Sequence, residues 1–148
     1  MNTQQKHLYF SVGDFGMLTA ATDILEIQQY DAALCQHSGS AAQHHGKTVQ
    51  WRDGSLPFLC LRECLQLEAR DPEKILILQD AVGTALAVLG VDSVHEILTI
   101  DESLRFHFSG IHAELNTLFD QLYVYHQNQQ ILLQLKPAEQ WIPALLRP

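Results

Sequence analysis

Hydrophobic and polar residues alternate along several short stretches of the chain, a pattern typical of β-strands with one buried face. In the first stretch Leu8, Phe10 and Val12 face one side, and the turn-forming residues 13–16 follow. The same reasoning predicts further strands over 17–20, 48–51, 56–61, 75–78, 84–91, 122–125 and 131–135. The sequence therefore predicts a mostly β protein whose short strands are joined by tight turns.

Few segments have the spacing of a helix, and those that do are short. Asp23 is placed to cap a single helical turn, with Ile24 and Ile27 on its inner face. Pro137 suits the first position of a C-terminal helix, and Pro143 is expected to limit that helix. The predicted helical segments are 23–27, 61–65, 92–97, 111–119 and 137–148.

The chain also contains an internal repeat. A shift of 70 residues places the first strand, its glycine turn and a later Glu-Ile pair on a second copy. The matched residues are Leu8 and Leu78, Gly13 and Gly83, Glu26 and Glu96, and Ile27 and Ile97; a shift of 74 matches Val49 with Tyr123 and Trp51 with Tyr125. We therefore expect a single domain over 1–148, built of two β-barrel halves at about 7–72 and 73–136 with a C-terminal helix over 137–148. Such small halves should pack together as one cooperative body.

Composition and charge narrow the classes of function. The chain has 148 residues, of which 47% are hydrophobic and 18% charged, which allows a substantial core. Its net charge of −8 repels phosphate groups, so neither nucleic acid nor an anionic membrane surface is an expected partner. No apolar run approaches the roughly 20 residues that span a bilayer, and residues 1–6 lack the apolar core of a signal peptide. We expect a cytoplasmic protein without membrane insertion.

The sequence offers little catalytic or metal-binding chemistry. Cys35, Cys60 and Cys64 form no Cys-x-x-Cys pair, so we expect reduced thiols. The motifs of nucleophile elbows, zinc-protease helices and phosphate-binding loops do not occur, so we expect no enzyme, no cofactor and no metal. A histidine-containing loop over 31–47 leaves a metal or small-molecule sensor as one alternative.

Four stretches carry a resemblance to a known family. They are the strand and turn at 8–13, the Ile-Leu-Glu-Ile segment at 24–27, the turn and strand at 51–62, and the apolar run at 87–94 that ends in Val-Asp-Ser-Val. In this order and spacing they resemble the CheW-like family, the adaptor proteins of bacterial chemotaxis, over about residues 7–136. Gln50, Asp53 and Cys60 stand where the family has asparagine, glycine and aspartate, so the chain resembles a divergent member.

The resemblance implies two packed SH3-like five-stranded β-barrels with short helices and a C-terminal helix. It also implies a non-catalytic scaffold that couples the cytoplasmic tips of chemoreceptors to the regulatory domain of a histidine kinase, itself CheW-like. It places Glu26 and Arg52 as a pair near the surface that binds these partners. The alternative is an interaction protein of the same fold that self-associates or serves another signalling complex. The sequence leaves the oligomeric state open.

Three further residues complete the predicted partner-binding set. Trp51 precedes Arg52 at the turn, where it could either anchor a partner or join the core. Val91 and Val94 belong to the apolar run and have the same two interpretations. Because an arginine offers a carboxylate two parallel hydrogen bonds, Glu26 and Arg52 could form an ion pair. The alternative is an exposed pair that only sets the geometry of the loop.

Overall fold

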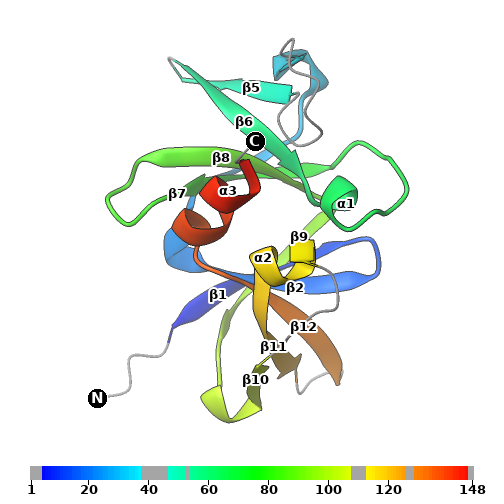
Figure 1. The fold of residues 1–148 in the computed structure, drawn as a ribbon, viewed down its shortest axis with the longest axis vertical. Coiled ribbons are helices and arrows are strands. Elements are labelled where there is room, and N and C mark those ends of the chain that lie inside the picture. The colour runs from blue at the N-terminus through cyan, green and yellow to red at the C-terminus, as the bar shows by residue number, and fades with distance from the viewer. Residues whose placement is uncertain (1–4, 38–46, 53, 108–112, 126–128, 147–148) are drawn as a thin grey trace.

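The computed structural model describes residues 5–37, 47–52, 54–107, 113–125 and 129–146. Its strands form two six-stranded sheets, one above the other in Figure 1, and the fold is mostly β with two SH3-like units, as predicted. Barrel 1 has the strand order β10 (Arg105–His107), β11 (Phe119–Tyr125), β12 (Gln130–Leu135), β2 (Phe15–Ala20), β1 (Lys6–Val12), β9 (Ser93–Thr99). Barrel 2 has the order β4 (Cys35–His37), β5 (Lys47–Trp51), β6 (Gly54–Cys60), β8 (Ala85–Val91), β7 (Lys74–Gln79), β3 (Ile24–Gln29).

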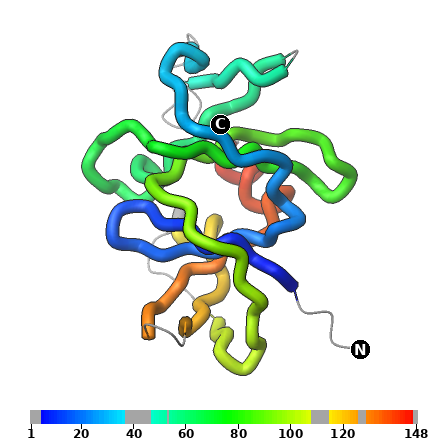
Figure 2. Tube along the Cα trace, turned by 180° about the vertical axis from the view of Figure 1, so that it is seen from behind, coloured from blue at the N-terminus to red at the C-terminus, as the bar shows by residue number. Residues whose placement is uncertain are grey.

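The two barrels have the same strand order once β1 is matched with β7, in agreement with the sequence repeat. The predicted division into barrel halves at 7–72 and 73–136 is nevertheless wrong, because each barrel takes strands from both halves. β3 pairs antiparallel with β7, and β9 pairs antiparallel with β1. The halves therefore exchange their first two strands: β1 and β2 join β9–β12 in barrel 1, and β7 and β8 join β3–β6 in barrel 2. Figure 2 shows these two crossings from behind. The parallel pairs β6–β8 and β12–β2 complete the exchange.

Each sheet has one strand more than the five expected. The additional strands are β4 and β10, which have three residues each and lie at an outer edge. Each follows a short 3₁₀ turn, at Ala32–Leu34 and Glu102–Leu104. Asp31 and Asp101, 70 residues apart, cap these turns by accepting a hydrogen bond from the amide two residues later, both at 3.0 Å. The repeat therefore extends to these caps.

Two predicted helical turns are strands. Segments 23–27 and 92–97 fall in β3 and β9, although a 3₁₀ turn over Ala21–Asp23 does precede β3. The apolar spacing in these segments fits either a helix face or a strand, and pairing with β7 and β1 selects the strand.

The helices are α1 (Leu61–Cys64), α2 (Ala113–Leu118) and α3 (Ala138–Leu146). All three lie in segments predicted to be helical. Pro143 does not end α3 but lies inside it, exposed to solvent. The preceding residues Trp141 and Ile142 are buried and hold the helix against the core.

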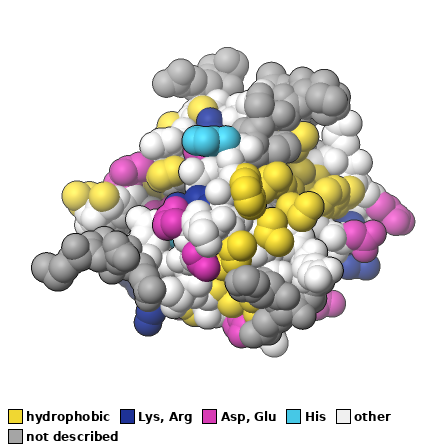
Figure 3. Space-filling model, turned by 90° about the horizontal axis from the view of Figure 1, so that it is seen from below, with side chains coloured by type: hydrophobic (Ala, Val, Ile, Leu, Met, Phe, Trp, Pro, Cys, Tyr) yellow, Lys and Arg dark blue, Asp and Glu magenta, His cyan; other side chains and the backbone are white. Residues whose placement is uncertain are grey.

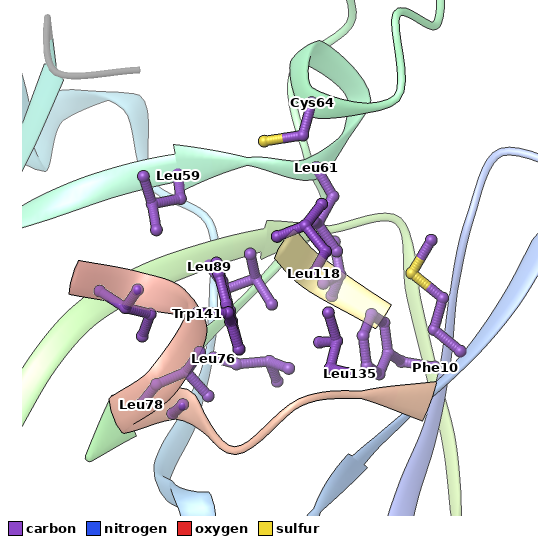
Figure 4. Close-up of a cluster of buried hydrophobic side chains, with 14 of the residues drawn as sticks. Phe10, Leu59, Leu61, Cys64, Leu76, Leu78, Leu89, Leu118, Leu135 and Trp141 are labelled. Carbon is purple, nitrogen blue, oxygen red and sulfur yellow. The ribbon is translucent and has the colours of Figure 1, made fainter. Parts of the chain in front are cut away.

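The largest core lies between the two barrels and is built from both of them. β1 contributes Leu8, Phe10 and Val12, while β7 and β8 contribute their matching apolar residues. Trp141 of α3 is fully buried here, beside strands of barrel 2 (Figure 4). Each barrel has a second, smaller cluster of its own. The shared core makes the packing of each barrel depend on the other.

A buried ion pair joins three turns at this junction. Arg62 of α1 donates from Nε to Asp92 Oδ1 at 3.0 Å and from Nη2 to Asp92 Oδ2 at 2.6 Å. The amide of Gly13, in the turn between β1 and β2, also donates to Asp92 Oδ2 at 2.6 Å. Arg62 Nη1 donates to the Glu68 carbonyl at 3.0 Å. Both charged side chains are only 10% exposed, so this two-bond pairing is shielded from water.

Replacing Asp92 by Asn is expected to destabilise the protein by about 3 kcal/mol, because the Arg62 guanidinium then stays buried without a counter-charge. Urea unfolding at neutral pH measures this difference. Asp14→Asn, which removes an exposed carboxylate from the nearby turn, is the matched control and should leave the unfolding midpoint nearly unchanged.

The same pair predicts a pH dependence. Burial acts to raise the pKa of Asp92, but hydrogen bonds from Arg62 and the Gly13 amide, with nearby arginine charges, lower it below its usual value of 3.8. The carboxylate therefore stabilises the fold above pH 3.8, and this contribution is lost as the pH falls through the lower, folded-state pKa. The stability gap between wild type and Asp92→Asn should narrow over that acid range. A gap of constant size would contradict this account.

Candidate functional site

Three of the five predicted partner-binding residues meet at one place in barrel 2. Trp51, at the end of β5, donates from its indole Nε1 to Glu26 Oε2 on β3 at 3.1 Å. In the sheet, β7, β8 and β6 separate β3 from β5. The hydrogen bond therefore joins strands from opposite ends of the sheet, where the sheet curves round on itself. We call Glu26, Trp51 and Arg52 the turn cluster.

Arg52 is held by the Trp51 ring rather than by a carboxylate. Its guanidinium carbon lies 4.1 Å from the centre of the indole, a cation–π contact. The backbone of Arg52 has φ of 52°, in the left-handed region, as the tight turn between β5 and β6 requires. Among the described residues no ion pair joins Arg52 to Glu26, so the indole takes the place of the direct ion pair considered above. The exposed guanidinium keeps its hydrogen-bond donors directed to solvent or to a partner.

The Glu26 carboxylate is kept ionised by its neighbours. Gln28 Nε2 donates to its Oε1 at 2.8 Å, and Trp51 donates to its other oxygen. These two hydrogen bonds, with the charge of Arg52, lower the pKa of Glu26 despite partial burial. The turn cluster thus presents a positive charge over the face of one aromatic ring and a negative charge at its edge.

The repeat places an equivalent of this contact in barrel 1. Tyr125 OH donates to Glu96 Oε1 at 2.8 Å. Glu96 and Tyr125 match Glu26 and Trp51 at shifts of 70 and 74. Both glutamates therefore accept a hydrogen bond from an aromatic residue across the closure of their barrel. The repeat alone contained this signal, since both pairs of residues were already aligned in the sequence.

Exposed apolar side chains lie beside both glutamates. Ile27 is 44% exposed and Ile97 is 51% exposed, whereas most other apolar residues that the repeat matches are buried. Figure 3 shows hydrophobic side chains gathered on one face of the molecule. The large exposed hydrophobic residues are Phe15, Ile27, Leu34, Val82, Ile97, Phe106 and Ile131. Because successive side chains of a strand point to opposite faces of the sheet, each isoleucine lies on the other face of its strand from the glutamate that precedes it.

The other two predicted residues belong to the core. Val91 ends β8 with 1% of its surface exposed and packs in the cluster between the barrels. Val94 of β9 is half-buried and packs against the same cluster. The structure therefore assigns Val91 to packing rather than to direct contact with a partner. Val94 is half-buried, so only part of its side chain could contact a partner.

The structure describes only part of the loop that the metal-sensor alternative depends on. Within the described residues no group of three or more His, Cys, Asp or Glu side chains is placed to hold a metal ion. Most of the histidine-containing loop over 31–47, with His44 and His45, lies outside those residues. Burial raises the pKa of the Cys60 thiol, so it is less nucleophilic than a free thiol. In the part of the chain that the structure describes, no helix has the length and apolar character needed to cross a bilayer.

Comparison with known proteins gives a family and a fold. The family model described as CheW-like domain matches residues 6–113. The structure is similar to the crystal structure of the scaffolding protein TtCheW from Thermoanaerobacter tengcongensis, with a TM-score of 0.72 and 16% sequence identity over 90% of each chain. No curated protein matches the sequence.

Trp51→Phe tests whether the indole fixes the charge of Glu26. The substitution removes the Nε1 donor and keeps an aromatic ring, so the pKa of Glu26 should rise toward its usual 4.5, in part only because Gln28 still donates. A pH titration of the side-chain carboxyl by carbon NMR measures this value. Tyr125→Phe removes the equivalent donor from barrel 1 and should leave Glu26 unchanged. An unaltered pKa in Trp51→Phe would show that the indole bond is not formed in solution.

Proposed function

The chain belongs to the CheW-like domain family, and on that premise we propose that it is a non-catalytic adaptor of bacterial chemotaxis-type signalling. It couples the cytoplasmic tip of a chemoreceptor to the regulatory domain of a histidine kinase through protein–protein contacts. The observation that carries this proposal is the turn cluster. The turn cluster lies where the family resemblance implies the partner-binding pair. On this proposal the protein works in the cytoplasm.

The chemistry of the turn cluster suits recognition of another protein. Trp51 is half-buried and already rigid, so little side-chain entropy is lost when a partner packs on it. Arg52 offers unused donors to a carboxylate or carbonyl of the partner, and Glu26 offers an acceptor. Charges of this kind set orientation and association rate more than affinity.

A second candidate function is self-association, and one observation favours it. The pair Glu96 and Tyr125 repeats on barrel 1 the hydrogen bond between the glutamate and the aromatic residue of the turn cluster. A molecule with two related contact sites can bind a CheW-like partner at either one, including a second copy of itself. The two functions differ in the partner and can be separated by sedimentation of the protein alone.

Arg52→Glu is expected to weaken binding to the regulatory domain of the host's chemotaxis kinase at least tenfold, because it reverses the charge at the contact surface. Calorimetry at moderate salt measures the affinity. Lys6→Glu makes the same change in net charge on the exposed start of β1 and should bind as wild type does. Equal affinities for wild type and Arg52→Glu would remove Arg52 from the interface. No binding of the folded wild type would contradict the adaptor proposal, and concentration-dependent sedimentation would then favour self-association.

A further inference from the structure

Gln28 is a neighbour of the turn cluster that the family resemblance does not single out. It follows Glu26 by two residues on β3, so both side chains leave the same face of the strand. Its Nε2 donates to Glu26 Oε1 at 2.8 Å, while the Trp51 indole donates to Glu26 Oε2 at 3.1 Å. Each oxygen of the carboxylate therefore has a donor of its own, and the two donors come from different strands.

The repeat shows that the fold does not need an amide at this position. A shift of 70 residues matches Gln28 with Leu98 of β9. Leu98 is half-buried and packs against the apolar cluster of barrel 1. A leucine therefore suits this position of the barrel. The amide of Gln28 is explained by the carboxylate that it binds rather than by packing.

The two opposite charges of the turn cluster contact the same indole but not each other. The Arg52 guanidinium lies over the face of the ring, and the Glu26 carboxylate binds its edge. Within the described part of the chain, no ion pair joins Arg52 to a carboxylate. After the hydrogen bonds from its two donors, the charge of Arg52 is a further cause that lowers the pKa of Glu26. The two charges are thus neighbours that stay unpaired.

The two hydrogen bonds explain why the charges stay apart. A hydrogen bond to a charged group stabilises more than an exposed ion pair does, because water screens the pair and ordering two long side chains costs entropy. The bonds from Gln28 and Trp51 therefore hold the carboxylate against the attraction of Arg52. Removal of the amide would leave Glu26 Oε1 without its donor, beside a guanidinium that can supply another.

We propose that Gln28 is a positioning residue that keeps Arg52 available to a partner. By holding Glu26 Oε1, its amide prevents the carboxylate from closing on the guanidinium. Arg52 then stays on the indole and offers its donors to a carboxylate or carbonyl group of the partner. An ion pair between Glu26 and Arg52 is the closed arrangement of the same side chains. This inference rests on the role of the turn cluster in partner binding proposed above.

Gln28→Leu tests the positioning on the full-length protein alone. Nitrogen NMR follows the Arg52 Nε–H group while the pH is lowered through the titration of Glu26. In the wild type this signal should change little, because the carboxylate is bound to other donors. In Gln28→Leu it should shift as Glu26 is protonated, and its proton should exchange more slowly with water while Glu26 is ionised. The same Arg52 behaviour in both proteins would overturn the proposal.

Gln29→Leu is the matched control. It makes the same substitution one residue later, at an exposed position on the opposite face of the strand, and should give the wild-type Arg52 signal. Because barrel 1 has leucine at the matching position, Gln28→Leu is expected to fold. Gln28→Ala, which also removes the amide, replaces it if it does not.

Partner binding gives the second readout. Gln28→Leu should bind the kinase regulatory domain about threefold to fivefold more weakly than wild type, because the partner must first break an exposed ion pair. Glu26→Gln keeps an acceptor oxygen but has no charge to pair with Arg52. Adding Gln28→Leu to Glu26→Gln should therefore weaken binding no further. A loss of equal size in both backgrounds would mean that Gln28 acts independently of Glu26 and would contradict the proposal.

Failure of this inference is distinct from failure of the adaptor function. If the folded wild type does not bind the regulatory domain, the adaptor proposal is contradicted, while the Arg52 signal still decides the role of Gln28. If the wild type binds and the Arg52 signal is the same in Gln28→Leu, the adaptor proposal stands and the positioning role of Gln28 is wrong.

Discussion

The pairing of Arg62 with Asp92 is the contact on which the arrangement of the barrels depends. Asp92 stands between β8 and β9, at the point where the chain leaves barrel 2 for barrel 1. Its carboxylate also binds the Gly13 amide in barrel 1 and the guanidinium that follows β6 of barrel 2. One buried charge pair therefore fixes the strand crossing, a hairpin turn and a helix relative to one another. The apolar core between the barrels is packed beside this fixed point.

The sequence predicted the elements that local periodicity determines. The strands around Phe10, Ile77 and Leu132 have one or two buried faces, and their patterns are visible within a few residues. Segments 23–27 and 92–97 were wrongly predicted as helical turns because their conformation is set by partners far along the chain. The exchange of the first two strands between the halves could not be predicted from the sequence either. A repeat of this kind is compatible with two separate barrels and with two that share strands.

Only part of the candidate site could likewise be predicted from the sequence. The family resemblance pointed to Glu26 and Arg52, and the position beside the turn pointed to Trp51. Which of these three side chains contact each other depends on side-chain geometry. The indole of Trp51 stacks on the guanidinium of Arg52 and donates a hydrogen bond to the carboxylate of Glu26. The short edge strand β10 also had no local signal, because it is defined by its pairing with β11 and not by its own periodicity.

The exchange of strands has a consequence for how the chain can be divided. A cut in the loop between α1 and β7 would give one fragment with the strands β1 to β6 and another with β7 to β12. Neither fragment holds all the strands of either barrel, because each barrel needs two strands from one and four from the other. Each fragment would therefore need the other to complete both barrels. The protein is built as an intramolecular dimer whose subunits have traded strands, so assembly of its two halves and folding are one event.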